Sequence, residues 1–173
     1  MRYIKNGAIA ADSFVYVEGD ETVPSDVPAI VSADWLFSTS KQQIRERSAP
    51  LGVNWPNDRT VSELAPYLPD LALVALEFPV FRDGRAYTQA RLLRERHGFK
   101  GEIRATGDVL RDQFLFMVRA GFDAFEVKKA ADADAFAKVL HEITLRYQPA
   151  AGGPLQAFRS RLNLPEKGKE GDA

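Results

Sequence analysis

One unit occurs twice between residues 77 and 127: an apolar strand leads into a short polar turn, and a helix follows. The turns lie at Asp83-Gly84 and at Gly107-Asp108, and arginines crowd both of them. Ahead of the first unit, residues 71–76 form an unbroken apolar run, which is typical of a strand covered on both faces. Strands and helices that alternate in this way predict right-handed crossovers and a parallel sheet.

The same alternation extends over most of the chain. We expect strands at residues 52–55, 71–76, 102–105 and 124–127. We expect helices over about residues 32–47, 86–97 and 109–120. Two further helices are expected to start at a capping box formed by Thr60 and Glu63 and at Asp132 or Asp134. The predicted fold class is therefore α/β: consecutive βα units form a parallel sheet, either half of a TIM-type barrel or an open sheet.

Length and composition favour one domain with additions at its two ends. The chain has 173 residues, 45% of them hydrophobic, which suffices for a single core. Residues 1–28 carry β-prone segments at 3–4 and 14–17 and predict an N-terminal β-hairpin or flap. Residues 29–147 are expected to form the single α/β domain, and residues 148–173 a flexible C-terminal tail.

Several apolar side chains are assigned to the core. On the helix over residues 109–120, helical spacing gives Leu110, Phe114, Met117 and Val118. The aromatic side chains expected in the core are Trp35, Phe37, Trp55, Phe114 and Phe116. In the tail, the alternative to a frayed terminus is a segment that docks on a partner through Leu155, Phe158 and Leu162.

Charge and composition narrow the function classes. Lys and Arg number 23 against 24 Asp and Glu, so the net charge of -1 gives no general reason to bind nucleic acid or an anionic membrane. The chain has no cysteine, which excludes disulfides, thiolate metal sites and thiol redox chemistry. It begins without the apolar stretch of a secretory signal, so a cytoplasmic protein is expected.

The two polar turns predict an anion site. If their strands are parallel neighbours, both turns emerge at the carboxyl edge of the sheet, where open α/β proteins bind ligands. A helix start offers free amides, and arginine offers planar donors suited to oxyanions of sulfur or phosphorus. The predicted ligand-binding residues are Asp83, Gly84, Arg85, Arg104, Gly107, Asp108, Arg111 and Asp112. The alternative is that Asp83 and Asp108 cap helices, while acids pair with the arginines on the surface.

Other chemistry is not indicated. His97 and His141 lie near expected helix ends without further groups at metal-ligand spacing, so no metal site is predicted. The serines lack a nucleophile-elbow context, and the sequence has neither a P-loop nor a Gly-x-Gly-x-x-Gly fingerprint. The catalytic residues therefore stay unknown.

The region of the repeated unit resembles a known bacterial family. It contains Phe-Pro-Val-Phe-Arg-Asp-Gly-Arg, Gly-Glu-Ile-Arg-Ala-Thr-Gly-Asp-Val-Leu-Arg-Asp-Gln and Arg-Ala-Gly-Phe-Asp-Ala-Phe. These motifs resemble the family called domain of unknown function 934, and the likeness extends more loosely over residues 29–145. After Asp-Gly-Arg, members often have Gly-Phe/Tyr-Ser, where this chain has Ala86-Tyr87-Thr88.

The resemblance implies a pathway. Members are encoded near sulfite reductase and adenylylsulfate reductase and are described as oxidoreductases of sulfite reduction. We therefore expect a cytoplasmic accessory that binds sulfite reductase, or a small oxyanion, through the predicted residues. The alternative is an enzyme in its own right that holds a flavin, a nicotinamide or a phosphorylated ligand at the same edge. The cofactor is unknown, and a homodimer stays open.

Overall fold

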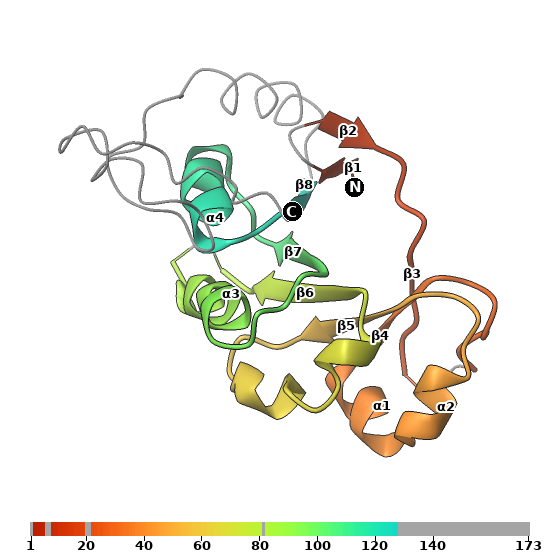
Figure 1. The fold of residues 1–173 in the computed structure, drawn as a ribbon. Coiled ribbons are helices and arrows are strands. Elements are labelled where there is room, and N and C mark those ends of the chain that lie inside the picture. The colour runs from red at the N-terminus through yellow and green to blue at the C-terminus, as the bar shows by residue number, and fades with distance from the viewer. Residues whose placement is uncertain (1, 6–7, 20–21, 81, 128–173) are drawn as a thin grey trace, which may run out of the picture.

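The structure is a computed structural model, and it describes residues 2–5, 8–19, 22–80 and 82–127. Its main feature is one sheet that curls into a half barrel (Figure 1). The eight strands, in spatial order, are β2 (Ala8–Ala10), β1 (Arg2–Lys5), β8 (Ala124–Val127), β7 (Glu102–Gly107), β6 (Leu73–Phe78), β5 (Leu51–Trp55), β4 (Ala29–Ser32) and β3 (Val15–Tyr16).

The sheet is mostly parallel. Neighbours from β3 through to β8 run parallel, whereas β1 pairs antiparallel with β8 on one side and with β2 on the other. In the register of β6 and β7, Phe78 lies opposite Gly107. The two strands therefore end at the same edge, and the predicted α/β class with consecutive βα units and an N-terminal hairpin is confirmed.

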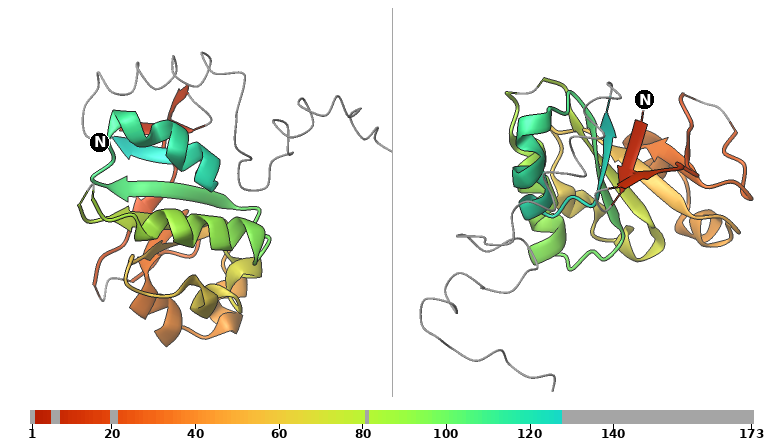
Figure 2. Two further views of the ribbon diagram at one scale, coloured as in Figure 1. Left: turned by 90° about the vertical axis from the view of Figure 1, so that its left-hand side faces the viewer. Right: turned by 90° about the horizontal axis from the view of Figure 1, so that it is seen from above.

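Helices cover the convex face of the sheet. The longest are α3 (Arg85–Glu95) and α4 (Phe114–Ala120), which lie side by side over β6, β7 and β8 (Figure 2). The other helical elements are α1 (Ala33–Ser38), α2 (Lys41–Arg45) and the 3-10 turns η1 (Val61–Leu64), η2 (Leu68–Asp70) and η3 (Arg111–Gln113). The core between the sheet and these helices includes Trp55, Leu76, Phe78, Ala105 and Phe125.

The concave face has a different composition. Because side chains alternate along a strand, Ile103 and Ala105 enter the helix-side core while Arg104 points to the opposite face. A small apolar cluster of Ile30, Leu73 and Ala75 lies there, with Phe14 packed against it. The chain between β2 and β3 therefore passes over the concave side of the sheet, joining its two edges (Figure 1).

The N-terminal hairpin is built differently from the prediction. We expected residues 14–17 to pair with residues 3–4, but β1 pairs with β2 and β3 joins the far edge, parallel to β4. The segment of residues 11–14 separates the two strands and carries no regular structure. The prediction paired β-prone segments that are close in the sequence. In the curled sheet, β3 instead pairs with β4, which lies farther along the chain.

Two predicted helices are shorter in the structure. The helix expected over residues 32–47 is interrupted at Thr39, which is extended, and Ser40 starts α2 with its own capping box. The helix expected after Thr60 is only the 3-10 turn η1; the Thr60 side chain caps it, but the Glu63 carboxylate accepts from Arg59 at 3.2 Å.

Two core assignments on the second repeat are wrong. Phe114 and Met117 are buried and Val118 packs against the core, but Leu110 is 37% exposed and Phe116 is 65% exposed. Phe114 and Met117 lie on the face of α4 that is turned toward the core. Phe116 lies on another face of the same helix, so its side chain is exposed although its neighbours are buried. The helix predicted from Asp132 or Asp134 and the tail over residues 148–173 lie outside the described residues.

Candidate functional site

The carboxyl edge of β6 and β7 is tightly folded. Gly107 has a φ of 86°, and a Cβ at this position would lie 2.4 Å from the carbonyl oxygen of Phe78. The next residue, Asp108, donates its backbone N–H to that same oxygen at 2.7 Å. The second polar turn thus needs glycine at residue 107, since a side chain would meet both strain and backbone.

At the first turn, Asp83 and Arg85 satisfy each other. Oδ1 of Asp83 accepts from the backbone N of Arg85 at 3.2 Å, and Oδ2 accepts from the Arg85 guanidinium at 2.6 Å. These bonds from the side chain and backbone of Arg85 hold the pKa of Asp83 well below its ordinary value. The carboxylate therefore lies beside the first residue of α3, and an incoming oxyanion would compete with it.

The side-chain contacts of Arg104 do not involve the residues of this turn. Its side chain is fully buried, and its partners are Asp12 at 2.7 Å, Glu102 at 2.9 Å and Glu126 at 3.0 Å. None of these carboxylates belongs to the predicted edge. The structure therefore places Arg104 on the concave face, and it does not bring this guanidinium together with Arg85.

The surroundings of Arg104 form what we call the concave cluster: Tyr3, Lys5, Asp12, Phe14, Tyr16, Glu102, Arg104 and Glu126. The Tyr3 hydroxyl donates to Glu102 at 2.7 Å, and the Tyr16 hydroxyl donates to Glu126 at 2.6 Å. The ring of Tyr3 lies 4.4 Å from the guanidinium carbon of Arg104, within cation–π distance. Each carboxylate of the strands is thus shared between the arginine and a tyrosine.

Burial and partners act in opposite directions on the pKa values of the concave cluster. Burial alone would lower the pKa of Arg104, but the bonds and charges of Asp12 and Glu102 outweigh it and raise that pKa. Burial would raise the pKa of Glu102, but Lys5, Tyr3 and Arg104 lower it below the ordinary value. The pKa values of both tyrosines are raised, first by burial and then by the acids they contact. The contacts of the concave cluster therefore favour the charged forms of Arg104 and Glu102 and the neutral forms of Tyr3 and Tyr16.

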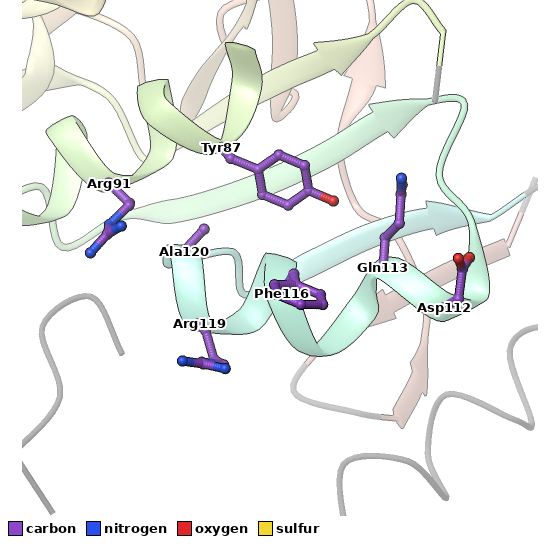
Figure 3. A pocket seen from close by; sticks show the side chains of 7 residues that line it. All are labelled: Tyr87, Arg91, Asp112, Gln113, Phe116, Arg119 and Ala120. Atoms are coloured by element: carbon purple, nitrogen blue, oxygen red, sulfur yellow. The ribbon is translucent and has the colours of Figure 1, made fainter. Parts of the chain in front are cut away.

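A groove lies beside the carboxyl edge, between α3 and α4 (Figure 3). Its volume is about 800 Å³, and its lining residues are Tyr87, Arg91, Asp112, Gln113, Phe116, Arg119 and Ala120. We call it the α3–α4 groove. Figure 3 shows the two arginines toward one end and Asp112 and Gln113 toward the other, with both aromatic rings between them.

The α3–α4 groove combines aromatic surface with charge. Phe116 is largely exposed, whereas Tyr87 is half-buried and has a pKa raised by burial and by the charge of Asp112. Arg91 is paired only at 3.6 Å with Glu95, and its side chain is mostly exposed. A ligand entering the groove would meet an apolar centre with planar cationic donors at one end.

The groove includes part of the predicted set. Asp112 lines it, and Gly84 lies near one of its lining residues, since a Cβ at Gly84 would lie 3.8 Å from the ring of Tyr87. Gly107 is the last residue of β7, Asp108 follows it, and Arg111 is the first residue of η3.

Sequence reasoning missed Tyr87, Arg91, Phe116 and Arg119. The spacing of Tyr87 and Arg91, four residues apart, puts them on one face of α3, and this was the signal that could have found them.

Within the described residues, no group of three or more His, Asp or Glu side chains could hold a metal ion. In the same part of the chain, no helix has both the length and the apolar character needed to cross a membrane.

A comparison with known protein families identifies the family of the chain. Residues 52–158 match the model of a family described as bacterial protein of unknown function (DUF934). The chain belongs to this family. The matched region contains the α3–α4 groove and the strands that carry Glu102, Arg104 and Glu126, whereas β1 to β4 precede it. No curated protein matches the DUF934 chain.

Proposed function

We propose that this DUF934 protein is a cytoplasmic accessory of assimilatory sulfite reduction and docks on sulfite reductase through the α3–α4 groove. Membership of the family and the motifs over residues 77–127 support the pathway. One observation carries the docking: Phe116 is 65% exposed in a groove that also presents two arginines. Exposed aromatic and arginine side chains are enriched among the residues that dominate binding at protein interfaces.

The groove also defines the kind of surface that fits it. A partner would insert an apolar side chain against Phe116 and Tyr87 and place acidic groups near Arg91 and Arg119. Since the whole chain carries a net charge of only -1, the attraction is local and comes from the groove itself. Such an interface associates faster at low ionic strength, and salt weakens it.

A small oxyanion at the carboxyl edge stays a second mode of the same proposal. It would be held by Arg85, Arg111 and the backbone amides of the turns at Gly84 and Gly107, and the carboxylates of Asp83, Asp108 and Asp112 would have to turn away from it. Because Asp83 already binds Arg85, this mode requires the pair to open, and it is the weaker of the two.

Binding of the purified chain to the sulfite reductase haemoprotein tests the docking. We expect Phe116→Ala and Arg91→Glu each to weaken binding at least about tenfold, which corresponds to about 1.4 kcal/mol. Ile9→Ala on β2 and Arg45→Glu on α2 are matched controls, since one is an exposed apolar residue and the other a paired surface arginine outside the groove. Equal losses in the controls, or no binding of the wild-type chain at low salt, would reject the docking.

An oxidoreductase in its own right is the alternative function. The volume of the groove, about 800 Å³, lies in the range of cofactor sites, and Tyr87 and Phe116 offer rings for a planar group. This function predicts a stoichiometric flavin or nicotinamide on protein purified from its native host. A visible absorption spectrum with such a band would replace the accessory proposal.

A further inference from the structure

The guanidinium of Arg104 binds acids from two different parts of the chain: from the strands and from the irregular segment of residues 11–14. Its inner nitrogen, Nε, donates to Glu102 within β7 at 2.9 Å. Its two outer nitrogens donate to the two oxygens of Asp12, at 2.7 and 3.0 Å, and one of them, Nη1, also donates to Glu126 at 3.0 Å. This bidentate arrangement is how arginine binds a free carboxylate or a comparable oxyanion.

Asp12 differs from the other two acids in its setting. Glu102 and Glu126 belong to β7 and β8, in the centre of the sheet, and their side chains are 7% and 11% exposed. Asp12 belongs to the irregular segment of residues 11–14, and its side chain is 26% exposed. Asp12 is therefore the most exposed of the three acids and the one that lies outside the strands, where its Oδ1 also accepts from the backbone N of Phe14 at 3.1 Å.

We propose that Asp12 is an internal, displaceable ligand and that the concave cluster is a binding site for a small anion with two acceptor oxygens. Opening of residues 11–14 would expose the outer fork of Arg104, with the ring of Tyr3 at its side. An incoming carboxylate or sulfur oxyanion would then take the place of the Asp12 side chain.

Charge balance restricts the ligand further. With Asp12 in place, the positive Lys5 and Arg104 face the negative Asp12, Glu102 and Glu126. Removing Asp12 leaves two charges of each sign, so one singly charged anion restores the native balance. A doubly charged anion would add repulsion against the two buried glutamates. The site should therefore prefer formate, acetate or hydrogen sulfite to sulfate.

Chemical rescue tests this site. The variant Asp12→Ala lacks the internal ligand, and its melting temperature is measured against formate, acetate, sulfite and sulfate, with chloride at matched ionic strength. At ten times its Kd, formate should raise the melting temperature of the variant by about 3–6 °C more than that of the wild-type chain. The double variant Asp12→Ala/Arg104→Met should lose the gain, and Asp12→Ala/Arg91→Met, with the groove arginine changed, should keep it.

The anions that rescue the variant show which chemical class the site binds. Rescue by formate and acetate alone assigns the site to carboxylates, and rescue by sulfite at the same concentration assigns it to sulfur oxyanions. An equal shift in the variant and the wild-type chain would overturn the proposal.

If Asp12→Ala does not fold, hydrogen exchange of the wild-type chain provides the test. Formate should then lower the protection of residues 8–17 saturably, and unchanged protection at the highest formate concentration would overturn the proposal.

Discussion

The concave cluster and the α3–α4 groove lie on opposite faces of the same sheet, and they treat arginine in opposite ways. Arg104 is fully buried and is bound by three carboxylates, two of which are shared with tyrosines. Arg91 lies at the surface beside an exposed phenylalanine, with one distant acid. An arginine in the first setting is occupied by acids of the chain itself, whereas one in the second is exposed to a partner.

Removing the two arginines should give the largest contrast. Arg104→Met leaves Glu102 and Glu126 without their shared counter-charge, and breaking a buried ion pair costs about 3–5 kcal/mol. Arg91→Met removes an exposed pair and should cost about 0–1 kcal/mol. Urea denaturation of both variants measures the difference. Similar losses would show that the concave cluster contributes no more to stability than a surface pair.

The two phenylalanines of α4 give the next contrast. Phe114 is buried against Phe125, so Phe114→Ala should lower the free energy of unfolding by about 3–5 kcal/mol. Phe116→Ala should change it by about 0.5 kcal/mol or less, because this ring is exposed. Thermal and urea denaturation are the measurement. A large loss at Phe116 would mean that the ring supports the fold, and the docking proposal would lose its main argument.

A smaller effect is expected at the turns that precede α3 and η3. Gly107→Ala forces a Cβ onto the Phe78 carbonyl at a positive φ and should cost about 1–3 kcal/mol. Gly84 has a φ of -85° and open space up to the Tyr87 ring at 3.8 Å, so Gly84→Ala should change stability by less than about 1 kcal/mol. Paired urea titrations compare the two. Equal costs would show that the second turn is not as tightly constrained as its geometry indicates.

The smallest effect is a dependence on alkaline pH. The folded chain raises the pKa of Tyr3 and Tyr16 above the ordinary tyrosine value of 10.0. Their contribution to stability is therefore complete below about pH 10 and is lost as the pH rises further, because the unfolded chain ionises first. Midpoints of urea denaturation between pH 9 and 12 should fall.

Two variants separate the sources of this fall. The Tyr3→Phe/Tyr16→Phe chain should show a flatter decline above pH 10 than the wild-type chain. Tyr87→Phe should alter the slope less, since the pKa of the groove tyrosine is raised to a smaller degree. A wild-type profile without any decline above pH 10 would contradict the neutral, hydrogen-bonded tyrosines of the concave cluster.

Local sequence signals predicted the βα units well. The apolar run before Phe78 is a buried strand, and Gly121 ends α4 in a left-handed conformation, as the sequence indicated. Signals of the same kind failed where the outcome depended on distant partners. Nothing near Val15 and Tyr16 shows that they pair with β4 rather than with β1, because the decision lies in the curl of the whole sheet.

The predicted site shows the same division. The sequence located the carboxyl edge, since parallel neighbours must end together, and Asp112 does line the groove. It could not show that Arg104 faces the concave side, because one residue of shift along a strand reverses the face. It also could not show the contact with Asp12, which lies 92 positions away along the chain.

The pairing of β1 with β8 has a consequence for biosynthesis. The first strand to be translated can pair with β2 at once, but it obtains its second partner, β8, only when residues 124–127 have been made, and at about 5–20 residues per second this takes several seconds or more. During this interval Arg104 cannot have its full set of counter-charges, and the strand edge of the nascent polypeptide stays unpaired. Chaperones that bind close to the ribosome would therefore find their substrate in the N-terminal strand of this chain, before the barrel-like sheet is complete.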